Sequence, residues 1–509
     1  MEYLIGTDIG TSGTKTIIMD TKGRLISSDL QEYDIITPKA LWAEQWPDIW
    51  VEATKRSIKN AREKANCDPA DIKGICISGL YGGSGVPLDQ EMKPVRPCLI
   101  WMDRRAGKQE KWVLDNIGKE KLYEITHNGT DPYYGYTKIL WIKHNEPENW
   151  AKIKLFLPPN AYAIYKLTGE VAIDYSSAGN IGGIFDEEKR VWSEEMLQAM
   201  DIPVSMMPQR IVESSDIVGG LTVEVASELG LAQGTPVCAG GVDCVVATLG
   251  LGIFEPGSYA AAIGTSMCAA FVHDYPINAK GLIEMPYVKD AHRLSYSFGG
   301  GATAGALPKW FRDNFAQLEK QAEEQGGENA YKALDREAAE IPAGSDGLVV
   351  LPYFMGERSP VWDTNARGNI FGLTLFHTKA HVYRAFLEAV AYSLRHTMES
   401  TNTNLGDYIL VAGGAAKSSL WRQIIADVTG YPIICPVNDV EANLGDVILA
   451  GVGTGVLTYD DVKDWQVLGE KVMPNKEAHE RYNQYYNLYH SIYTHLKEDM
   501  AQAAQLSRG

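Results

Sequence analysis

The chain has 509 residues, and at about 150 residues per domain this length favours two or three domains. Apolar residues make up 45% and charged residues 22%, a globular mixture that argues against a disordered chain. The formal net charge of -18 repels phosphate backbones and anionic membranes, so we expect no nucleic-acid and no membrane partner. An acidic protein can still bind a nucleotide through a few backbone amides and a metal ion.

Targeting and cysteine signals point to a cytoplasmic protein. No window contains 18 consecutive apolar residues, and the N-terminus lacks a basic leader with a cleavage pattern. The seven cysteines are irregularly spaced and include no CxxC pair. They therefore predict buried free thiols in a reducing compartment, and neither a disulfide framework nor a zinc site.

The N-terminal region alternates strand and helix patterns. Residues 3–8 and 15–20 are apolar runs joined by a Gly/Ser/Thr turn, and a third run follows a Lys-Gly turn. This pattern predicts an antiparallel meander of three strands. Residues 46–66 have helical spacing and residues 72–78 form another apolar run, so the chain is expected to have an α/β fold with sheets covered by helices.

A similar block recurs halfway along the chain. The apolar run at residues 258–263 leads into Gly-Thr-Ser at 264–266 and then into another apolar run. The same tripeptide follows the first strand at residues 10–12. Two such junctions predict an internal duplication, with a domain boundary near residue 252. The expected domains are residues 1–252 and 253–509.

Two further segments of the C-terminal half carry strong patterns. Residues 408–411 are an apolar run that ends in a Gly-Gly-Ala turn, where the backbone can approach a flat ring such as adenine. A plain strand–helix turn has the same pattern. Residues 477–496 place tyrosines and aliphatic residues at three- and four-residue steps, which predicts an amphipathic helix. Its aromatic stripe is either core or a partner face.

The turn at residues 8–15 has the composition of a phosphate loop. Two glycines allow amides to point inward, hydroxyls can donate to phosphate oxygens, and Lys15 adds a positive charge. Asp8 could hold a divalent cation through water at the strand end. The loop is not a Walker A motif, and a plain hairpin turn with polar residues remains the alternative.

Asp243 is a candidate general base. It stands alone in a glycine-rich apolar setting at the expected domain junction. Phosphoryl transfer requires a carboxylate that accepts the proton of the attacking hydroxyl. The alternative is that Asp243 only caps the helix that follows it.

Taken together and in this order, these motifs resemble those of the FGGY carbohydrate kinases, members of the actin/hexokinase/heat-shock-protein ATPase superfamily. The motifs are the Asp8 loop, Gly-Gly-Val-Asp243, the Gly-Thr-Ser of residues 264–266 and the Gly-Gly-Ala turn. Residues 368–388 are similar to the C-terminal signature of the family, although Phe386 is bulkier than the usual residue. Residues 355–360, 41–45 and 101–105 resemble xylulokinase blocks.

The resemblance implies two ribonuclease-H-like (actin-like ATPase) domains that close on ATP–Mg²⁺ and a sugar or polyol. It implies that Asp243 is the base and that Asp8 organises magnesium. The residues implied to bind the phosphates and the adenosine are Thr11, Ser12, Thr14, Lys15, Gly264, Thr265, Gly305, Lys309, Gly414, Ala415 and Ser418. Family members are often dimers or tetramers, so a homodimer is expected.

The substrate region departs from the family pattern. Xylulokinases usually carry Gln-Met-His-Gly after the strand at residues 72–78, and glycerol kinases carry Gln-Arg-Glu-Thr, whereas this chain has Leu-Tyr-Gly-Gly at residues 80–83. The missing side chains would bind substrate hydroxyls, so the sequence identifies the reaction better than the substrate. The candidate pocket residues are Tyr81, Gly82, Trp101, Asp103 and Tyr133.

Three function classes follow from the sequence. The first is a kinase that uses ATP to phosphorylate a primary hydroxyl of a small sugar, a ketopentose such as xylulose being favoured over glycerol, a tetritol, gluconate or ribulose. The second is a non-catalytic, nucleotide-gated member of the superfamily. The third is a sugar-binding protein, which leaves the two phosphate-type loops unexplained. The first class also predicts that sugar binding closes the two domains around the cleft.

Overall fold

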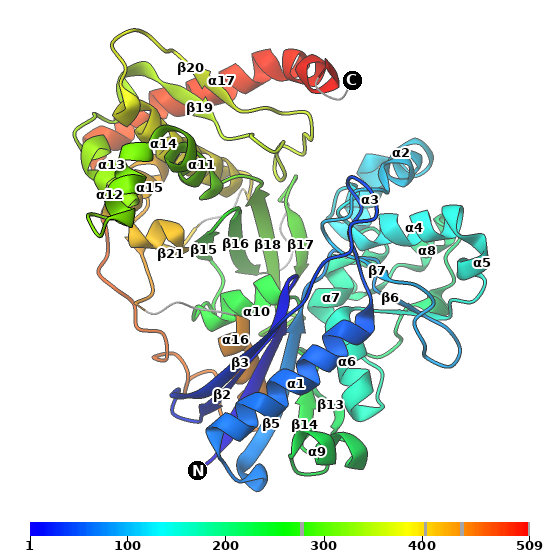
Figure 1. Cartoon of the computed structure of the whole chain (residues 1–509). Helices are drawn as coiled ribbons and strands as arrows, with labels where there is room; N and C mark the ends of the chain where they lie inside the picture. The colour runs from blue at the N-terminus through cyan, green and yellow to red at the C-terminus, as the bar shows by residue number, and fades with distance from the viewer. Residues whose placement is uncertain (275–278, 402–404, 438–441, 507–509) are drawn as a thin grey trace.

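The computed structural model describes residues 1–274, 279–401, 405–437 and 442–506. Figure 1 shows two lobes, each built around one of two six-stranded sheets, with helices packed on the sheets. The expected α/β class and the division into two sheet-centred domains are confirmed.

The first sheet has the strand order β13-β14-β5-β1-β2-β3. Strands β1, β2 and β3 pair in antiparallel fashion, which confirms the predicted meander, and β5 runs parallel to β1. The strands are β1 (Tyr3–Ile9), β2 (Gly13–Asp20), β3 (Leu25–Glu32), β5 (Ile72–Gly79), β13 (Ile217–Gly220) and β14 (Pro236–Cys238).

The second sheet repeats this arrangement. Its order is β17-β18-β16-β15-β21-β22, with β15 antiparallel to β16 and parallel to β21. The predicted duplication is therefore visible in the strand pairing, with β15 in the place of β1. The strands are β15 (Ser258–Ile263), β16 (Met267–Asp274), β17 (Ile283–Pro286), β18 (Leu294–Gly301), β21 (Ile409–Gly413) and β22 (Ile433–Ile434).

Helices α1 (Pro47–Ala65) and α6 (Pro159–Thr168) cover one face of the first sheet. Helix α1 matches the predicted helix at residues 46–66. It begins with a proline in its first turn and ends at Asn66, whose left-handed conformation (φ 50°) stops the helix. Its buried face includes Trp50 and Ile58, neither of which is exposed to solvent.

Helices α10 (Asp243–Gly250) and α16 (Ala442–Gly453) lie between the two sheets (Figure 1). Although α16 comes late in the chain, it packs on β1 and β5 of the first sheet. It crosses α10 at Gly445, where an added Cβ would lie 2.0 Å from the carbonyl oxygen of Val246. Thr248 of α10 contacts Tyr296 of β18 through their hydroxyls, 3.3 Å apart. The two helices thus join the lobes directly below the cleft.

The first lobe also carries a layer of short helices and strands at the right of Figure 1. Its elements include α2 (Gly107–Asn116), α3 (Lys119–Thr126), α4 (Gly135–Asn145), α5 (Pro147–Trp150), α7 (Tyr175–Asn180), α8 (Glu194–Ala199), β4 (Glu44–Gln45), β6 (Val86–Leu88), β7 (Cys98–Leu99), β8 (Leu155–Leu157), β9 (Ile173–Asp174), β10 (Phe185–Asp186), β11 (Val191–Trp192) and β12 (Ile211–Val212). Helix α9 (Val223–Leu229) lies at the far end of the lobe.

The second lobe is completed by helices that cover the outer face of its sheet. They are α11 (Ala306–Phe315), α12 (Gln317–Glu324), α13 (Ala330–Ala339), α14 (Lys379–Glu399), α15 (Ser419–Thr429) and α17 (Lys476–Leu506), with the hairpin of β19 (Val349–Leu351) and β20 (Asn369–Phe371). Helix α17 confirms the predicted C-terminal helix and extends beyond it. Its residues Tyr482, Tyr489 and Ile492 are buried in the core, so the aromatic stripe packs within the lobe.

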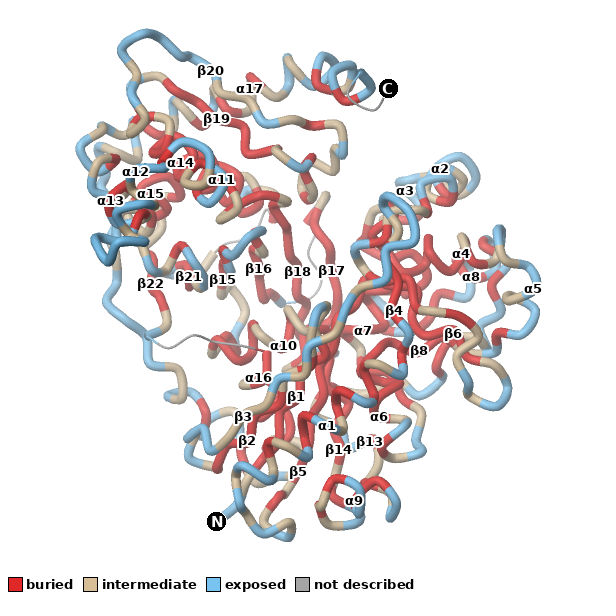
Figure 2. Tube along the Cα trace, in the orientation of Figure 1, coloured by how far each residue is buried: buried red, intermediate tan, exposed pale blue. Residues whose placement is uncertain are grey.

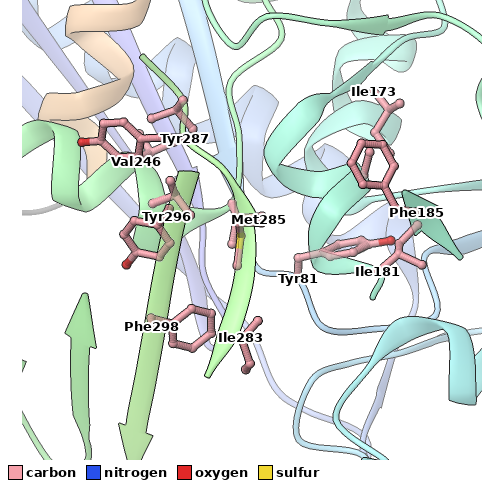
Figure 3. Close-up of a cluster of buried hydrophobic side chains, with 14 of the residues drawn as sticks. Tyr81, Ile173, Ile181, Phe185, Val246, Ile283, Met285, Tyr287, Tyr296 and Phe298 are labelled. Carbon is pink, nitrogen blue, oxygen red and sulfur yellow. The ribbon is translucent and has the colours of Figure 1, made fainter. Parts of the chain in front are cut away.

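Buried residues follow both sheets and the helices between them (Figure 2). One cluster spans the two lobes: Tyr296 and Phe298 of β18 and Tyr287, which follows β17, belong to the same buried cluster as Ile181 and Phe185 of the first lobe (Figure 3). The cysteines are free thiols, as expected. Three of them, Cys67, Cys244 and Cys268, are only half-buried, which corrects the prediction that all seven are buried.

Candidate active site

The first predicted phosphate loop is a tight turn between β1 and β2. The amide of Gly10 donates to the carbonyl oxygen of Gly13 across the turn at 2.9 Å. The Tyr33 hydroxyl donates to the carbonyl oxygen of Gly10 at 2.7 Å and thereby fixes the loop from the side of β3. The turn leaves Thr11 and Ser12 accessible to solvent, as a ligand-binding loop requires.

Asp243 is the first residue of α10, and Val242 occupies the N-cap position. Asp243 is therefore not the N-cap residue, and the alternative that it only caps the helix is wrong. Its Oδ1 accepts a 2.6 Å hydrogen bond from the amide of Cys244. The close crossing with α16 at Gly445 sets the position of α10, so the fold places this carboxylate at the floor of the cleft.

The electrostatic environment of Asp243 suits a general base. Burial, and then the negative charge of Asp8, raise the pKa of the Asp243 carboxyl to about 7. A base with a pKa near the working pH combines a useful ionised fraction with a strong tendency to take a proton. Asp8 lies at the end of β1, so two carboxylates predicted to share the site do lie close together.

A cavity of about 500 Å³ contains both carboxylates and the first loop. Its lining residues are Asp8, Gly10, Thr11, Ser12, Gly13, Lys15, Leu30, Glu32, Asp243, Cys244, Ala247, Ala442 and Asn443. The structure thus brings together the predicted metal, phosphate and base residues from three elements. Three of the predicted phosphate residues do not line the cavity: Thr14, whose buried hydroxyl lies 3.1 Å from the Tyr33 hydroxyl, and Gly264 and Thr265 of the second loop.

The acidic floor of this cavity could accept a divalent cation. The Ser78 hydroxyl lies 3.3 Å from Oδ1 of Asp8 and 2.8 Å from Oδ2 of Asp446. Burial and the charge of Asp8 raise the pKa of Asp446 well above its usual range, and its Oδ1 makes no hydrogen bond within the described residues. Asp8 supplies the hard carboxylate oxygens that Mg²⁺ prefers.

No group of three or more His, Cys, Asp or Glu side chains in the described residues could hold a metal by itself. This fits Mg²⁺ chemistry, because that ion usually keeps several waters and uses one or two carboxylates together with substrate phosphates. The residues present therefore fit a magnesium ion that arrives with a nucleotide.

The second loop meets the predicted adenosine residues at the ends of β15 and β21. The amide of Gly305 donates to the carbonyl oxygen of Gly264 at 2.7 Å, and Thr265 accepts from the amide of Ala304. A Cβ at Gly413 would lie 3.4 Å from the amide nitrogen of Gly264. Gly264, Thr265, Gly305 and the turn that contains Gly414 therefore form one cluster.

The remaining predicted nucleotide residues differ in accessibility. Lys309 is exposed on α11 and forms an ion pair with Asp313 at 3.2 Å. Ala415 is fully buried in the turn after β21. Ser418 caps α15, since its hydroxyl accepts from the amide of Trp421 at 3.0 Å.

Tyr133 and Gly82, two of the residues predicted to contact the substrate, lie together in the first lobe. Gly82 has a φ of 85°, and an added Cβ would lie 2.8 Å from the Tyr133 ring. The buried Lys138 donates to the carbonyl oxygens of Gly82, at 2.6 Å, and of Tyr133, at 2.5 Å. Burial lowers the pKa of Lys138 to about 7. One buried amine thus holds both pocket residues in place.

The other three predicted substrate residues have different surroundings. The Trp101 indole donates to the Thr11 hydroxyl at 3.0 Å and so links a predicted substrate residue to the predicted phosphate loop. Asp103 is buried, and its carboxylate accepts from the Arg105 guanidinium and from the amide of Ala43. Tyr81 is buried in the core beside Ile181 (Figure 3).

Comparison with known proteins decides the family. The N-terminal-domain profile of the FGGY family of carbohydrate kinases matches residues 3–250, and the C-terminal-domain profile matches residues 259–454. The chain belongs to the FGGY family of carbohydrate kinases. Its reaction is the ATP-dependent phosphorylation of a sugar.

Relatives and a solved structure agree with this assignment. A xylulose kinase of Lactococcus lactis is 31% identical over 98% of each chain. A gluconokinase of Bacillus subtilis is 30% identical over 100% of this chain and 98% of its own length. A xylulose kinase from Rhodospirillum rubrum is 28% identical to this chain, and its crystal structure matches with a TM-score of 0.90. The match covers 98% of this chain and 100% of that one. No described helix has the length and apolarity needed to span a membrane.

Three further residues near the predicted site could not be assigned from the sequence. Asn443 of α16 donates to the carbonyl oxygen of Lys15 at 2.8 Å, and no sequence signal connects these two segments. Lys138 stands in a tyrosine-rich block, but only its burial reveals its role. Arg358 belongs to the block at residues 355–360 that resembles xylulokinases, and the resemblance gave it no function.

Proposed function

We propose that the acceptor is a ketopentose such as xylulose, phosphorylated on a primary hydroxyl with Asp243 as the general base. The observation that carries the proposal is the placement of Asp243, with its pKa of about 7, beside Asp8 and the first phosphate loop in one cavity. The xylulose kinase of Lactococcus lactis, similar over nearly the whole chain, supports the choice of substrate.

Residues of both lobes would take part in the reaction. The loop containing Thr11 and Ser12 and the second loop at Gly264 would bind phosphate oxygens through hydroxyls and amides, which explains how so acidic a protein binds ATP. Asp243 would accept the proton as the sugar hydroxyl attacks the γ-phosphorus. Asp8 would hold Mg²⁺ through water, and the ion would supply neutralisation of the phosphate charge.

Gluconate is the second candidate acceptor, because a gluconokinase is nearly as similar to this chain as the xylulose kinase. Glycerol, tetritols and ribulose are lesser alternatives, and a non-catalytic role would leave the shifted pKa of Asp243 without a use. A cytoplasmic homodimer remains our expectation for the state of the protein.

A coupled ADP-release assay over xylulose, ribulose, gluconate, glycerol and tetritols tests this function. We expect a ketopentose to give the largest kcat/KM. If no sugar or polyol increases ADP release above the rate with ATP alone, the proposal is wrong and the non-catalytic class is favoured.

A further inference from the structure

A loop of the second lobe reaches across the cleft to the substrate side of the first lobe. The guanidinium carbon of Arg358 lies 5.8 Å from the centroid of the Trp101 ring. Four residues later, the Trp362 ring stacks on Tyr134 with centroids 6.3 Å apart. Trp101 and Tyr134 both belong to the first lobe, so residues 358–362 form part of the wall that faces an acceptor bound there.

Hydrogen bonds fix the backbone around Arg358. The Oε1 of Glu357 accepts from the amides of Ala302 and Arg358, both at 2.8 Å. The Ser359 hydroxyl accepts from the amide of Gly300 at 2.8 Å. The guanidinium rests on Gly300, where an added Cβ would lie 3.0 Å from its Nη2. Arg358 is therefore held in position before any ligand binds.

Two buried polar atoms of this segment have no partner within the part of the chain that the structure describes. Among the described residues, the buried Nε of Arg358 and the buried Oε2 of Glu357 have no hydrogen-bond partner. Buried donors without partners are costly and rare, and such an atom at a functional site calls for an explanation. The Nε itself is shielded, but Arg358 as a whole is only half-buried, and the terminal donors of its guanidinium match a planar ligand oxygen in the cleft.

Tyr133 connects this arginine with the proposed base. Burial is the main cause that raises the pKa of the Tyr133 phenol, and the charges of Arg358 and Asp243 act on it in opposite directions. The phenol therefore lies within reach of both charges. An open-chain sugar whose primary hydroxyl meets Asp243 and whose carbon chain follows Tyr133 would extend its other end toward Arg358.

We propose that Arg358 binds the oxygen acceptor at the end of the sugar remote from the phosphorylated hydroxyl, either the ketone of a ketose or the carboxylate of an aldonate. The proposal rests on the phosphoryl transfer at Asp243 proposed above. It makes Arg358 a specificity-determining residue, because the second lobe would then contact only acceptors long enough to span the site. Glycerol would be too short to use it.

The test compares the wild type with Arg358→Met and Arg358→Lys. Arg336→Met is the matched control, since Arg336 is an exposed arginine of the same lobe that pairs with Glu328 on the surface at 3.1 Å. The coupled assay measures kcat and KM for xylulose, gluconate, glycerol and ATP. Calorimetry with a nonhydrolysable ATP analogue measures the Kd of each sugar without turnover, and the thermal midpoint reports folding.

We expect Arg358→Met to raise the KM and Kd of the accepted sugar about 10- to 100-fold, the loss expected for a hydrogen bond to a charged group. Arg358→Lys should show a smaller loss, because an ammonium cannot present two parallel donors. The KM for ATP, the glycerol kinetics and the Arg336→Met variant should stay within about twofold of the wild type. A greater loss for gluconate would identify a carboxylate ligand, and a greater loss for xylulose a ketone.

Two results would overturn the role of Arg358. One is an unchanged sugar KM and Kd in Arg358→Met. The other is an equal loss of kcat/KM for glycerol and the longer sugars, or a raised KM for ATP, because either would show a phosphate or structural role. If the wild type phosphorylates no acceptor, the proposed function fails, and the calorimetric Kd values still decide whether Arg358 binds sugar.

Discussion

The crossing of α10 and α16 predicts a strong effect of Gly445→Ala on both stability and catalysis. The new Cβ would lie 2.0 Å from the carbonyl oxygen of Val246, whereas carbon contacts need roughly 3.5 Å. The helices must then separate by about 1.5 Å, and overpacking of this kind costs about 1–3 kcal/mol. At about 2 °C per kcal/mol for a lobe of roughly 250 residues, the thermal midpoint should fall by about 2–6 °C.

The catalytic effect follows from the position of Asp243 at the start of α10. A displacement of about 1 Å in a reacting group costs on the order of 100-fold in rate, so kcat should fall toward that extent. Gly107→Ala is the control, because no atom lies within 4 Å of its added Cβ at the start of α2. Thermal unfolding and the ADP-release assay measure the two effects. A Gly445→Ala protein with the wild-type midpoint and the wild-type kcat would show that the contact between Gly445 and Val246 does not set the position of α10.

Three further predictions concern the proposed base Asp243, the buried Lys138 and Gly82. Asp243 acts as a base only when ionised, so kcat/KM for the sugar should rise about tenfold per pH unit up to about pH 7 and then level off, and a flat profile between pH 5 and 7 would contradict this. The pKa of Lys138 is lowered from 10.5 to about 7, so above pH 7 the unfolded chain binds a proton that the folded chain does not. The free energy of unfolding of the wild type, measured by urea titration, should therefore rise relative to that of Lys138→Met by up to about 1.4 kcal/mol per pH unit from pH 7 to 9. A difference in unfolding free energy that does not change with pH would argue against a neutral buried amine. Gly82→Ala should raise the KM for the sugar, because the new Cβ displaces the Tyr133 ring. Gly118→Ala is the control and should leave this KM unchanged, since Gly118 has a similar φ of 90° and no atom lies near its added Cβ. The same KM in the two variants would show that Gly82 does not contribute to the sugar site.

Local patterns were sufficient to predict several strands of the two sheets. The meander of β1, β2 and β3 and the repeat of its pattern at β15 depend on alternating apolar runs and glycine turns, which are written in consecutive residues. Helix α1 was predicted to within a residue or two from its helical spacing, and in the structure a proline and a left-handed asparagine mark its ends. These features needed no knowledge of distant contacts.

The packing of α16 on the first sheet could not be predicted in the same way. Its residue Asn443 reaches the carbonyl oxygens of Gly6 and Lys15, more than 400 positions earlier in the chain. Such a contact depends on the shapes of two surfaces and leaves no periodic signal in either segment. A glycine such as Gly445 reads as a weak helix position until the facing helix is seen.

The residues of the candidate site also fall into those that a local motif predicts and those that only the folded structure reveals. Asp8, Thr11 and Asp243 stood in motifs with a chemical reason for their spacing, and the structure places them in one cavity. Lys138 and Arg358 could not be assigned, because their importance comes from burial and from unsatisfied donors, which only the folded chain defines.

The most direct test of the account is the turnover of Asp243→Asn with saturating sugar and ATP. The substitution keeps the shape of the side chain and removes the group that accepts the proton. We predict that kcat falls by about 10²–10⁴-fold, while the Kd of a nonhydrolysable ATP analogue stays within about threefold of the wild type. Undiminished turnover in Asp243→Asn would contradict the assignment of Asp243 as the base and, with it, the mechanism built on this cavity.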